Sequence, residues 1–393
     1  MKAKTVQCIS EKAPKKFTVI VKPTHACNLR CIYCYVPGSA ERGLMSSVTL
    51  RNVMNQSADV GQGKQITFIW HGGEPLLVGL QFFQEVASIS HLLRENGHDI
   101  KNVIQTNGTL ITESLLEFIV SERDFRLGFS IDGPAHINDI SRPKPRGKGS
   151  FAEIMTAVAK IRETERRHGT DCIGGGAICV VGRYNIDQLA EIYSFFKSNN
   201  LSVKFNPLFV SGRATDALSV LPIEYAESLC RLFDIWVDDI EDSIRVDPFE
   251  SIISNLISGV SGNCVFSLAC TKTFVSIGPM GDIYPCGRFD GVRKFRLGNV
   301  NNNQGLRDAL SSSIYVHLDS RQENLDSTCL QCQFLAICNG GCMHNAFIKG
   351  DVMTKDPFCI AYKTLYGHIL SKLLAVVKDA ARQTLTSIEG AQA

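Results

Sequence analysis

Three cysteines near the amino terminus lie close enough in the sequence to share one metal centre. Cys27, Cys31 and Cys34 are separated by three and then two residues, and they follow the apolar run at residues 17–21. Three thiolates that turn inward from one loop can hold a four-iron cluster, and without a fourth local cysteine one iron lacks a protein ligand. That open iron can bind and activate a small molecule. A structural zinc site is the alternative, although zinc usually takes four protein ligands.

A second motif, Gly72-Gly73-Glu74-Pro75, follows the next apolar segment of the chain. Two glycines let the backbone approach a ligand closely, and a carboxylate beside them can accept hydrogen bonds from an ammonium group. By itself, a Gly-Gly pair after a strand is more often only a turn. Its position one strand–helix unit after the cysteine loop favours a shared site.

Polar residues also end the next two apolar segments, where Asn107 and Ser130 stand, and Arg142 precedes a helical segment. Side chains at such positions usually cap helices or face solvent. A guanidinium group can instead bind a carboxylate, because its planar fork matches the two oxygens.

The C-x3-C-x2-C spacing, with an aromatic residue before the last cysteine, and the Gly-Gly-Glu-Pro motif resemble the signature of the radical S-adenosylmethionine (SAM) enzymes. The resemblance implies that the open iron chelates SAM, that the glycine motif holds its amino group, and that Ser130 and Arg142 bind its carboxylate. Leu208 is implied to pack near the adenine. The residues implied to bind SAM are Tyr33, Gly72, Gly73, Glu74, Asn107, Ser130, Arg142 and Leu208.

Eight further cysteines crowd the last third of the chain. Their spacing is Cys264-x5-Cys270-x15-Cys286, then Cys329-x2-Cys332-x5-Cys338-x3-Cys342, and finally Cys359. Soft thiolates select zinc or iron–sulfur clusters, so a two-zinc domain and a two-cluster domain are both open interpretations. Residues 274–277 and 282–285 flank a turn at 278–281, which predicts a β-hairpin between two of these cysteines.

This cysteine pattern resembles the SPASM domain of radical SAM peptide maturases, which carries two auxiliary [4Fe-4S] clusters. The resemblance implies three [4Fe-4S] clusters in all, with full thiolate ligation of both auxiliary clusters and electron transfer as their role. The implied ligands of the first auxiliary cluster are Cys264, Cys270, Cys286 and Cys342, and those of the second are Cys329, Cys332, Cys338 and Cys359.

The elements that must position these residues alternate between short apolar strands and amphipathic helices. Strands are predicted at 18–22, 65–70, 100–105, 125–131, 176–181 and 203–209, and helices at 47–59, 81–96, 113–121, 151–168 and 186–198. Repeated βα units predict a parallel sheet. The fold class is therefore α/β, a partial (β/α)6 TIM-type barrel with a C-terminal cysteine-rich SPASM domain, and the motifs fall on the rim where barrel enzymes keep their chemistry.

A chain of 393 residues is longer than one core usually grows. Two helices are predicted between residues 222 and 258, with Pro222 in the first turn of one and Pro248 at the start of the other. The predicted parts are an N-terminal extension (1–16), the barrel (17–221), a helical bridge (222–261), the SPASM domain (262–372) and a C-terminal helix and tail (373–393).

The composition is that of an ordinary globular chain, 44% hydrophobic and 20% charged, with a net charge of +2. This net charge does not indicate nucleic-acid binding. No apolar run is long enough to span a membrane or to serve as a secretory signal. Fifteen cysteines in such a chain indicate metal clusters in a reducing cytoplasm. Cys8, Cys172, Cys179 and Cys230 have no ligand spacing and receive no role.

The reaction is less sharply indicated than the cofactors. Anaerobic sulfatase maturases, which form formylglycine from cysteine or serine, carry an aspartate base directly after the cysteine that corresponds to Cys286. Gly287 stands there in this chain, followed by Arg288, and glycine cannot accept a proton. The leading hypothesis is therefore modification of a ribosomally made precursor peptide by a carbon–carbon (cyclophane) or thioether crosslink. Formylglycine formation is the alternative, and no catalytic residue is assigned.

The implied partners are the precursor peptide or protein substrate and an electron donor such as flavodoxin or ferredoxin. Because 26 residues precede Cys27, too few for a fused winged-helix domain, leader recognition is expected from a separate protein or from the exposed barrel and SPASM surface. An iron–sulfur electron-transfer protein or a zinc scaffold is the non-enzymatic alternative. Counting iron separates them, since three four-iron clusters hold about 12 irons.

Overall fold

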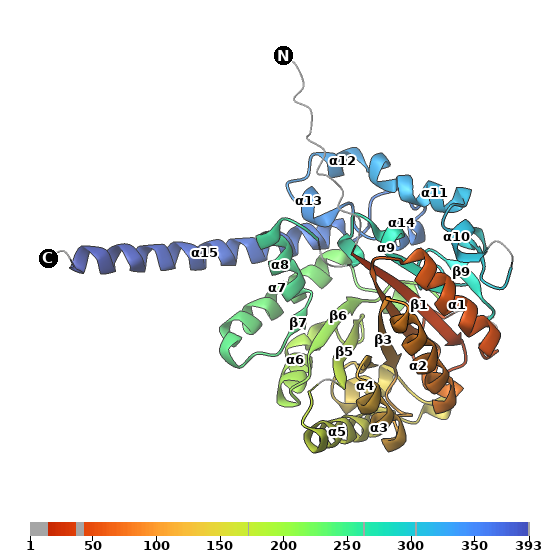
Figure 1. Cartoon of the computed structure of the whole chain (residues 1–393). Coiled ribbons are helices and arrows are strands. Elements are labelled where there is room, and N and C mark those ends of the chain that lie inside the picture. Colours follow the sequence, from red (N-terminus) through yellow and green to blue (C-terminus); the bar gives the residue numbers. More distant parts are fainter. Residues whose placement is uncertain (1–14, 37–42, 172, 262–263, 303–304, 392–393) are drawn as a thin grey trace, which may run out of the picture.

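The computed structural model describes residues 15–36, 43–171, 173–261, 264–302 and 305–391 (Figure 1). Of the predicted N-terminal extension, residues 1–14 lie outside the described part, as do Cys8 and Cys172. Ten strands form one sheet in the order β10-β9-β8-β1-β2-β3-β4-β5-β6-β7. The edges of this sheet are two different strands, which agrees with the predicted partial barrel.

The six predicted barrel strands are confirmed, and each pairs in parallel with the next. They are β1 (Lys16–Thr24), β2 (Gln65–Gly72), β3 (Asp99–Thr106), β4 (Phe125–Ser130), β5 (Gly174–Val181) and β6 (Val203–Pro207). Because the strands are parallel, their carboxyl ends meet at one rim, which brings the predicted motifs together.

The predicted helices are also present, with one difference near residue 186, where the first turn is a separate 3-10 helix (Ile186–Gln188). Ser46 and Thr112 begin two of the helices by accepting hydrogen bonds from Thr49 N and Leu115 N. The barrel helices are α1 (Ser47–Val60), α2 (Leu80–Glu95), α3 (Glu113–Glu122), α4 (Ala135–Ser141), α5 (Phe151–His168) and α6 (Leu189–Ser198).

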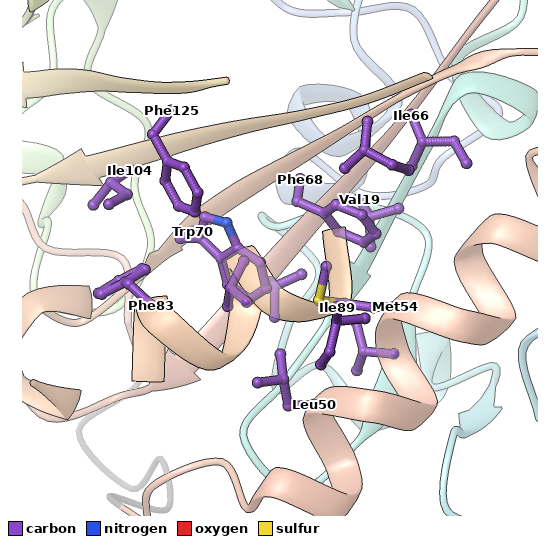
Figure 2. Close-up of a cluster of buried hydrophobic side chains, with 14 of the residues drawn as sticks. Val19, Leu50, Met54, Ile66, Phe68, Trp70, Phe83, Ile89, Ile104 and Phe125 are labelled. Atoms are coloured by element: carbon purple, nitrogen blue, oxygen red, sulfur yellow. The ribbon is translucent and has the colours of Figure 1, made fainter. Parts of the chain in front are cut away.

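Alternation along the strands sends one set of side chains to the helices and the other to the barrel interior. In β2, Phe68 and Trp70 are fully buried and pack with Leu50 of α1 and Phe83 of α2 (Figure 2). The intervening residues Ile69 and His71 line a cavity instead, so one strand builds the core and a wall of the site together.

The C-terminal hairpin β8 (Phe274–Ile277) and β9 (Asp282–Tyr284) matches the predicted one. Its place in the sheet was not predicted. Strand β8 pairs in parallel with β1, and β9 carries the short antiparallel strand β10 (Gly298–Asn299). At the opposite edge, β7 (Val246–Asp247) pairs with β6. The cysteine-rich part therefore continues the barrel sheet next to the strand that leads into the cysteine loop.

Two helices, α7 (Pro222–Asp238) and α8 (Phe249–Ser258), confirm the prediction for this region. Helix α15 (Cys359–Ala391) packs against both and then extends away from the body (Figure 1). The division predicted at residue 373 falls inside this helix. The short helices before it are α9 (Cys270–Thr273), α10 (Gly305–Ala309), α11 (Ser313–Asp319), α12 (Ser327–Leu330), α13 (Leu335–Cys338) and α14 (Met343–Ile348). The described part of the chain contains no helix with the length and apolar character needed to cross a membrane.

Candidate active site

A cavity of about 430 Å³ lies at the carboxyl ends of the strands, between the barrel and the cysteine-rich part. Two groups of cysteines that are far apart in the sequence line it together. They are the amino-terminal triplet Cys27, Cys31 and Cys34 and the four residues Cys264, Cys270, Cys286 and Cys342. One cavity thus faces both predicted cluster sites.

The cysteine loop is held by backbone hydrogen bonds from two sides. Gly73 N donates to Thr24 O at 3.0 Å and Glu74 N donates to Ala26 O at 2.8 Å, which ties the loop to the end of β2. On its other side, Arg30 N donates to Pro143 O at 2.7 Å. The loop is therefore held between the end of β2 and the segment at Pro143.

The two glycines of the Gly-Gly-Glu-Pro motif are required by this close approach. A Cβ atom on Gly73 would lie 2.1 Å from Ala26 O, and one on Gly72 would lie 2.5 Å from Thr24 O. Gly72 also has a φ of +117°, a conformation that residues with a Cβ rarely adopt. Both glycines line the cavity, so they let the β2 end serve as a cradle for the cysteine loop.

Glu74 lies in the motif but turns away from the cavity. Its carboxylate accepts hydrogen bonds from Leu76 N (3.0 Å), Thr106 Oγ1 (2.7 Å) and Asn107 N (2.7 Å). The side chain is fully buried, and it joins the motif to the end of β3. Its predicted contact with SAM stays a prediction.

Arg142, Tyr33 and Asp132 form a buried polar group at one wall. Arg142 donates to the Tyr33 hydroxyl at 2.6 Å, and that hydroxyl donates to Asp132 at 2.8 Å. Burial raises the pKa of Asp132, and the charge of Arg142 and hydrogen bonds from Ser141 and Val180 N oppose this. The buried Nε of Arg142 has no hydrogen-bond partner among the described residues. A guanidinium group with an unused donor on a cavity wall fits a carboxylate ligand.

Three other predicted contacts also line the cavity, namely Asn107, Ser130 and Leu208. Asn107 donates to Asn28 Oδ1 at 2.7 Å and lies 3.8 Å from the sulfur of Cys27. Gln105 donates weakly to the Ser130 hydroxyl at 3.4 Å. Seven of the eight predicted SAM contacts therefore surround one cavity, and Glu74 does not.

Burial raises the pKa of most of these thiols. It raises the pKa of Cys31 and of Cys286 to about 11, and Cys27 and Cys270 shift in the same direction. Nearby cysteines add to the effect, since their negative charges would repel one another. Several thiolates can share this apolar site only around a positive centre, which is what an iron–sulfur cluster supplies.

The remaining four cysteines of the C-terminal pattern also gather at one place. Cys329, Cys332, Cys338 and Cys359 line a separate small pocket beside Lys355. Among the described residues, no three His, Cys, Asp or Glu side chains converge closely enough to hold a single ion. Their soft thiolates suit zinc or an iron–sulfur cluster.

Sequence reasoning missed a buried ion pair that joins the two halves of the site. Lys22 at the end of β1 contacts Asp290 at 2.8 Å, and His25 contacts the same carboxylate at 2.8 Å. Burial opposes the ionised carboxylate, but His25 and Lys22 outweigh it and lower the pKa of Asp290 to about 2. A lysine at an inward strand position before the cysteine loop was the only sequence signal.

Gly287 and Arg288 face the cavity as well. The Arg288 guanidinium lies 4.4 Å from the centre of the Phe209 ring, and it donates to Asn345 Oδ1 at 3.1 Å. Opposite them, His71 lies 3.4 Å from the Tyr35 hydroxyl. Burial, with a smaller effect of Lys22, lowers the pKa of His71 to about 4, so this imidazole is neutral at pH 7.

Comparison with known families gives two matches within the chain. Residues 21–196 match the radical SAM superfamily, and residues 269–333 match the SPASM iron–sulfur cluster-binding domain. A serine-type anaerobic sulfatase-maturating enzyme of Bacteroides thetaiotaomicron is 30% identical over 94% of this chain and 93% of that protein. A cysteine-type enzyme of Clostridium perfringens is 26% identical over 92% of this chain and 98% of its own length.

Solved structures share the fold. Native anSMEcpe with bound AdoMet and the Cp18Cys peptide superposes with a TM-score of 0.81 at 24% identity, covering 93% of this chain and 99% of that chain. Streptococcus suis SuiB bound to the precursor peptide SuiA gives a TM-score of 0.60 at 18% identity, covering 87% and 75%. At these identities the likeness establishes the fold.

Proposed function

The chain belongs to the family of the anaerobic sulfatase-maturating enzymes, within the radical SAM enzymes that carry a SPASM domain, and we propose that it crosslinks a ribosomally made precursor peptide. It is a radical SAM enzyme of peptide or protein maturation that uses SAM and three [4Fe-4S] clusters. The proposed bond is a carbon–carbon (cyclophane) or thioether link to a side-chain carbon of the peptide.

The proposal assigns each cysteine group to one cluster. When bound, SAM on the open iron supplies a 5′-deoxyadenosyl radical, which takes a hydrogen atom from the substrate. The thiols described above are chemically suited to this role, since they are soft ligands. The SAM cluster is assigned to Cys27, Cys31 and Cys34, the first auxiliary cluster to Cys264, Cys270, Cys286 and Cys342, and the second to Cys329, Cys332, Cys338 and Cys359.

The side chains around the cavity would bind and orient SAM. Arg142 has a free, buried Nε for the carboxylate, and Ser130 lies on the same cavity. Gly72 and Gly73 bring backbone groups to the amino end of the ligand. Leu208 and its apolar neighbours exclude water from the adenine side, which protects a reactive intermediate from side reactions. Glu74 would act indirectly, by holding Asn107 and the motif in place.

The observation that carries the choice of reaction is the absence of a carboxylate from the cavity wall. Among the described residues, no aspartate or glutamate lines it. Asp290 is the nearest carboxylate in the loop after Cys286, and it is tied to Lys22 and His25 with a pKa of about 2, which makes it a poor base. Formation of formylglycine by a base directly after Cys286 is therefore disfavoured, because Gly287 takes that place.

Formylglycine formation remains the second candidate because of one finding. The serine-type sulfatase-maturating relative is 30% identical over nearly the whole of both chains. Such an enzyme would use the same cavity and the same radical chemistry. The difference between the two candidates lies in what happens to the peptide after the hydrogen atom has left.

A pair of peptide incubations separates the two candidates. Anaerobically reconstituted enzyme is given SAM and dithionite, with either a candidate precursor peptide or a sulfatase peptide that bears cysteine or serine. We expect 5′-deoxyadenosine and a precursor peptide that is lighter by two hydrogens and inert to a hydrazide probe for aldehydes. An unchanged precursor peptide, together with a sulfatase peptide that reacts with the probe, would reverse the ranking.

The proposed partners follow from this chemistry. The enzyme requires a low-potential electron donor such as flavodoxin or ferredoxin, and a cytoplasmic location would keep its many thiols reduced. Leader recognition would come from a separate leader-binding protein or from the exposed barrel and SPASM surface. Pull-down of the precursor peptide by the purified enzyme alone, compared with the enzyme plus such a protein, tests this point.

A further inference from the structure

Arg288 lines the cavity together with the first group of C-terminal cysteines. It follows Cys286 by two residues and lines the same cavity as Cys264 and Cys342. Its guanidinium rests on the face of Phe209 and is oriented by Asn345. Among the described residues, no carboxylate forms an ion pair with it. The side chain is thus fixed in position with its positive charge unbalanced by any nearby acid.

The cysteines are the negative partners within reach of Arg288. Cys264, Cys270, Cys286 and Cys342 line the same cavity as Arg288. Arg321 is another arginine of this part of the chain, but it does not line the cavity, and its guanidinium donates to the carbonyl oxygens of Thr354 and Gly340 at 2.9 Å each. Among the described residues, Arg288 is therefore the arginine that lines the cavity next to this group of cysteines.

We propose that Arg288 raises the reduction potential of the cluster assigned to Cys264, Cys270, Cys286 and Cys342, so that this site accepts an electron from the peptide. A nearby positive charge stabilises the more negative, reduced form of a cluster, and net charge and hydrogen bonding are known determinants of cluster potential. Arg288 is half-buried, which strengthens the effect, because solvent screens its charge less than that of a fully exposed side chain.

The role of this potential in catalysis rests on the proposed crosslinking function. Forming a carbon–carbon link removes two hydrogens from the peptide. The first hydrogen leaves the peptide as a hydrogen atom, which the 5′-deoxyadenosyl radical takes. The new carbon–carbon bond then forms and leaves a peptide radical. This radical loses the second hydrogen as a proton to solvent and one electron to the cluster. A higher potential beside the cavity makes this last transfer favourable. The potential itself does not depend on which peptide is modified.

The test is a redox titration of the reconstituted holoenzyme, followed by EPR and carried out without peptide. In Arg288→Gln, we expect one of the three midpoint potentials to become more negative by about 59 mV or more, which is a tenfold change in the ratio of reduced to oxidised cluster for a one-electron couple. Arg288→Lys keeps the charge and should show a smaller shift. Arg296→Gln removes a half-exposed arginine of the same loop and should leave all three potentials unchanged.

Three unchanged potentials in an Arg288→Gln protein with full iron content would overturn the inference. An increase of the KM for an acidic peptide without any change of potential would also overturn it, because Arg288 would then bind a substrate carboxylate. If the glutamine variant fails to take up iron, Arg288→Lys is compared with Arg288→Met. The same three midpoint potentials in these two variants would show that the charge at this position has no effect. Since no peptide is used in the titration, failure of the crosslinking assay leaves this result intact.

Discussion

The buried ammonium group of Lys22 lies 2.8 Å from the carboxylate of Asp290 and donates to the carbonyl oxygen of Gly287 at 2.9 Å. Lys22 lies two residues before the end of β1, the strand that leads into the amino-terminal cysteine loop, and Gly287 follows Cys286. One ion pair thereby fixes the position of one predicted cluster loop relative to the other. Electron transfer between two clusters depends on their separation, so this contact links the architecture to the chemistry.

Replacing Asp290 with asparagine should destabilise the protein strongly. The substitution leaves the buried Lys22 without its counter-charge, and breaking a buried pair in this way costs about 3–5 kcal/mol. Urea unfolding under anaerobic conditions measures the loss. Glu250→Gln is the control, because it breaks a pair with Arg245, which is 80% exposed, and should cost about 1 kcal/mol or less. Equal effects of the two substitutions would contradict the role given to Lys22.

Gly73→Ala should disrupt one cluster site selectively. The added Cβ meets Ala26 O at 2.1 Å, so the cysteine loop must move away from the end of β2. We expect the iron content to fall from about 12 to about 8 per chain, since the two auxiliary sites remain. Gly367→Ala is the matched control, because its Cβ has open space within α15 and should raise helix stability by up to about 1 kcal/mol. Full iron content in Gly73→Ala would contradict this account of the loop.

Stability should fall as the pH drops below neutrality, in part because of His71. Its pKa is lowered to about 4 in the folded chain, whereas an unfolded histidine titrates near about 6.5. Between these values the unfolded state binds more protons, so each pH unit costs up to about 1.4 kcal/mol. We expect His71→Gln to flatten the dependence of the urea midpoint between about pH 7 and pH 5. His136→Gln, at a side chain that is 60% exposed, should leave the slope unchanged, and identical slopes in all three proteins would refute the prediction.

Leu50 should be a stability residue with no direct part in the chemistry. Its side chain is fully buried between α1 and the sheet (Figure 2), and Leu50→Ala should cost about 2–5 kcal/mol. Leu92→Ala on α2, where the side chain is 59% exposed, should cost no more than about 0.5 kcal/mol. Both variants should reach the same iron content per folded chain. A specific loss of one cluster in Leu50→Ala would show that the core and the site are coupled.

The barrel could be predicted from the sequence because its signals are local. Apolar segments such as residues 65–70 carry the period of strands, and amphipathic segments such as 151–168 carry the period of helices. The hairpin around Gly281 was predicted for the same reason, since turn residues separate two short apolar runs. The cysteine groups could be proposed because ligand spacing is also a local property.

What the sequence could not supply are contacts between distant segments. The parallel pairing of β8 with β1 leaves no mark within either strand. The ion pair between Lys22 and Asp290 joins two residues that look unremarkable alone. The carboxylate of Glu74 accepts hydrogen bonds from Leu76 N, Thr106 Oγ1 and Asn107 N, and the last two come from a segment that the motif alone does not reveal. The orientation of Arg288 likewise depends on Phe209 and Asn345, which tertiary packing brings beside it.

Transfer of deuterium from the peptide to 5′-deoxyadenosine tests the central claim most directly. The precursor peptide is made with deuterium at the side-chain β-carbons, incubated with holoenzyme, SAM and dithionite, and both products are analysed by mass spectrometry. We expect 5′-deoxyadenosine that carries one deuterium, in an amount equal to the crosslinked peptide. Unlabelled 5′-deoxyadenosine beside an unchanged peptide, from enzyme with a full iron content, would contradict the account.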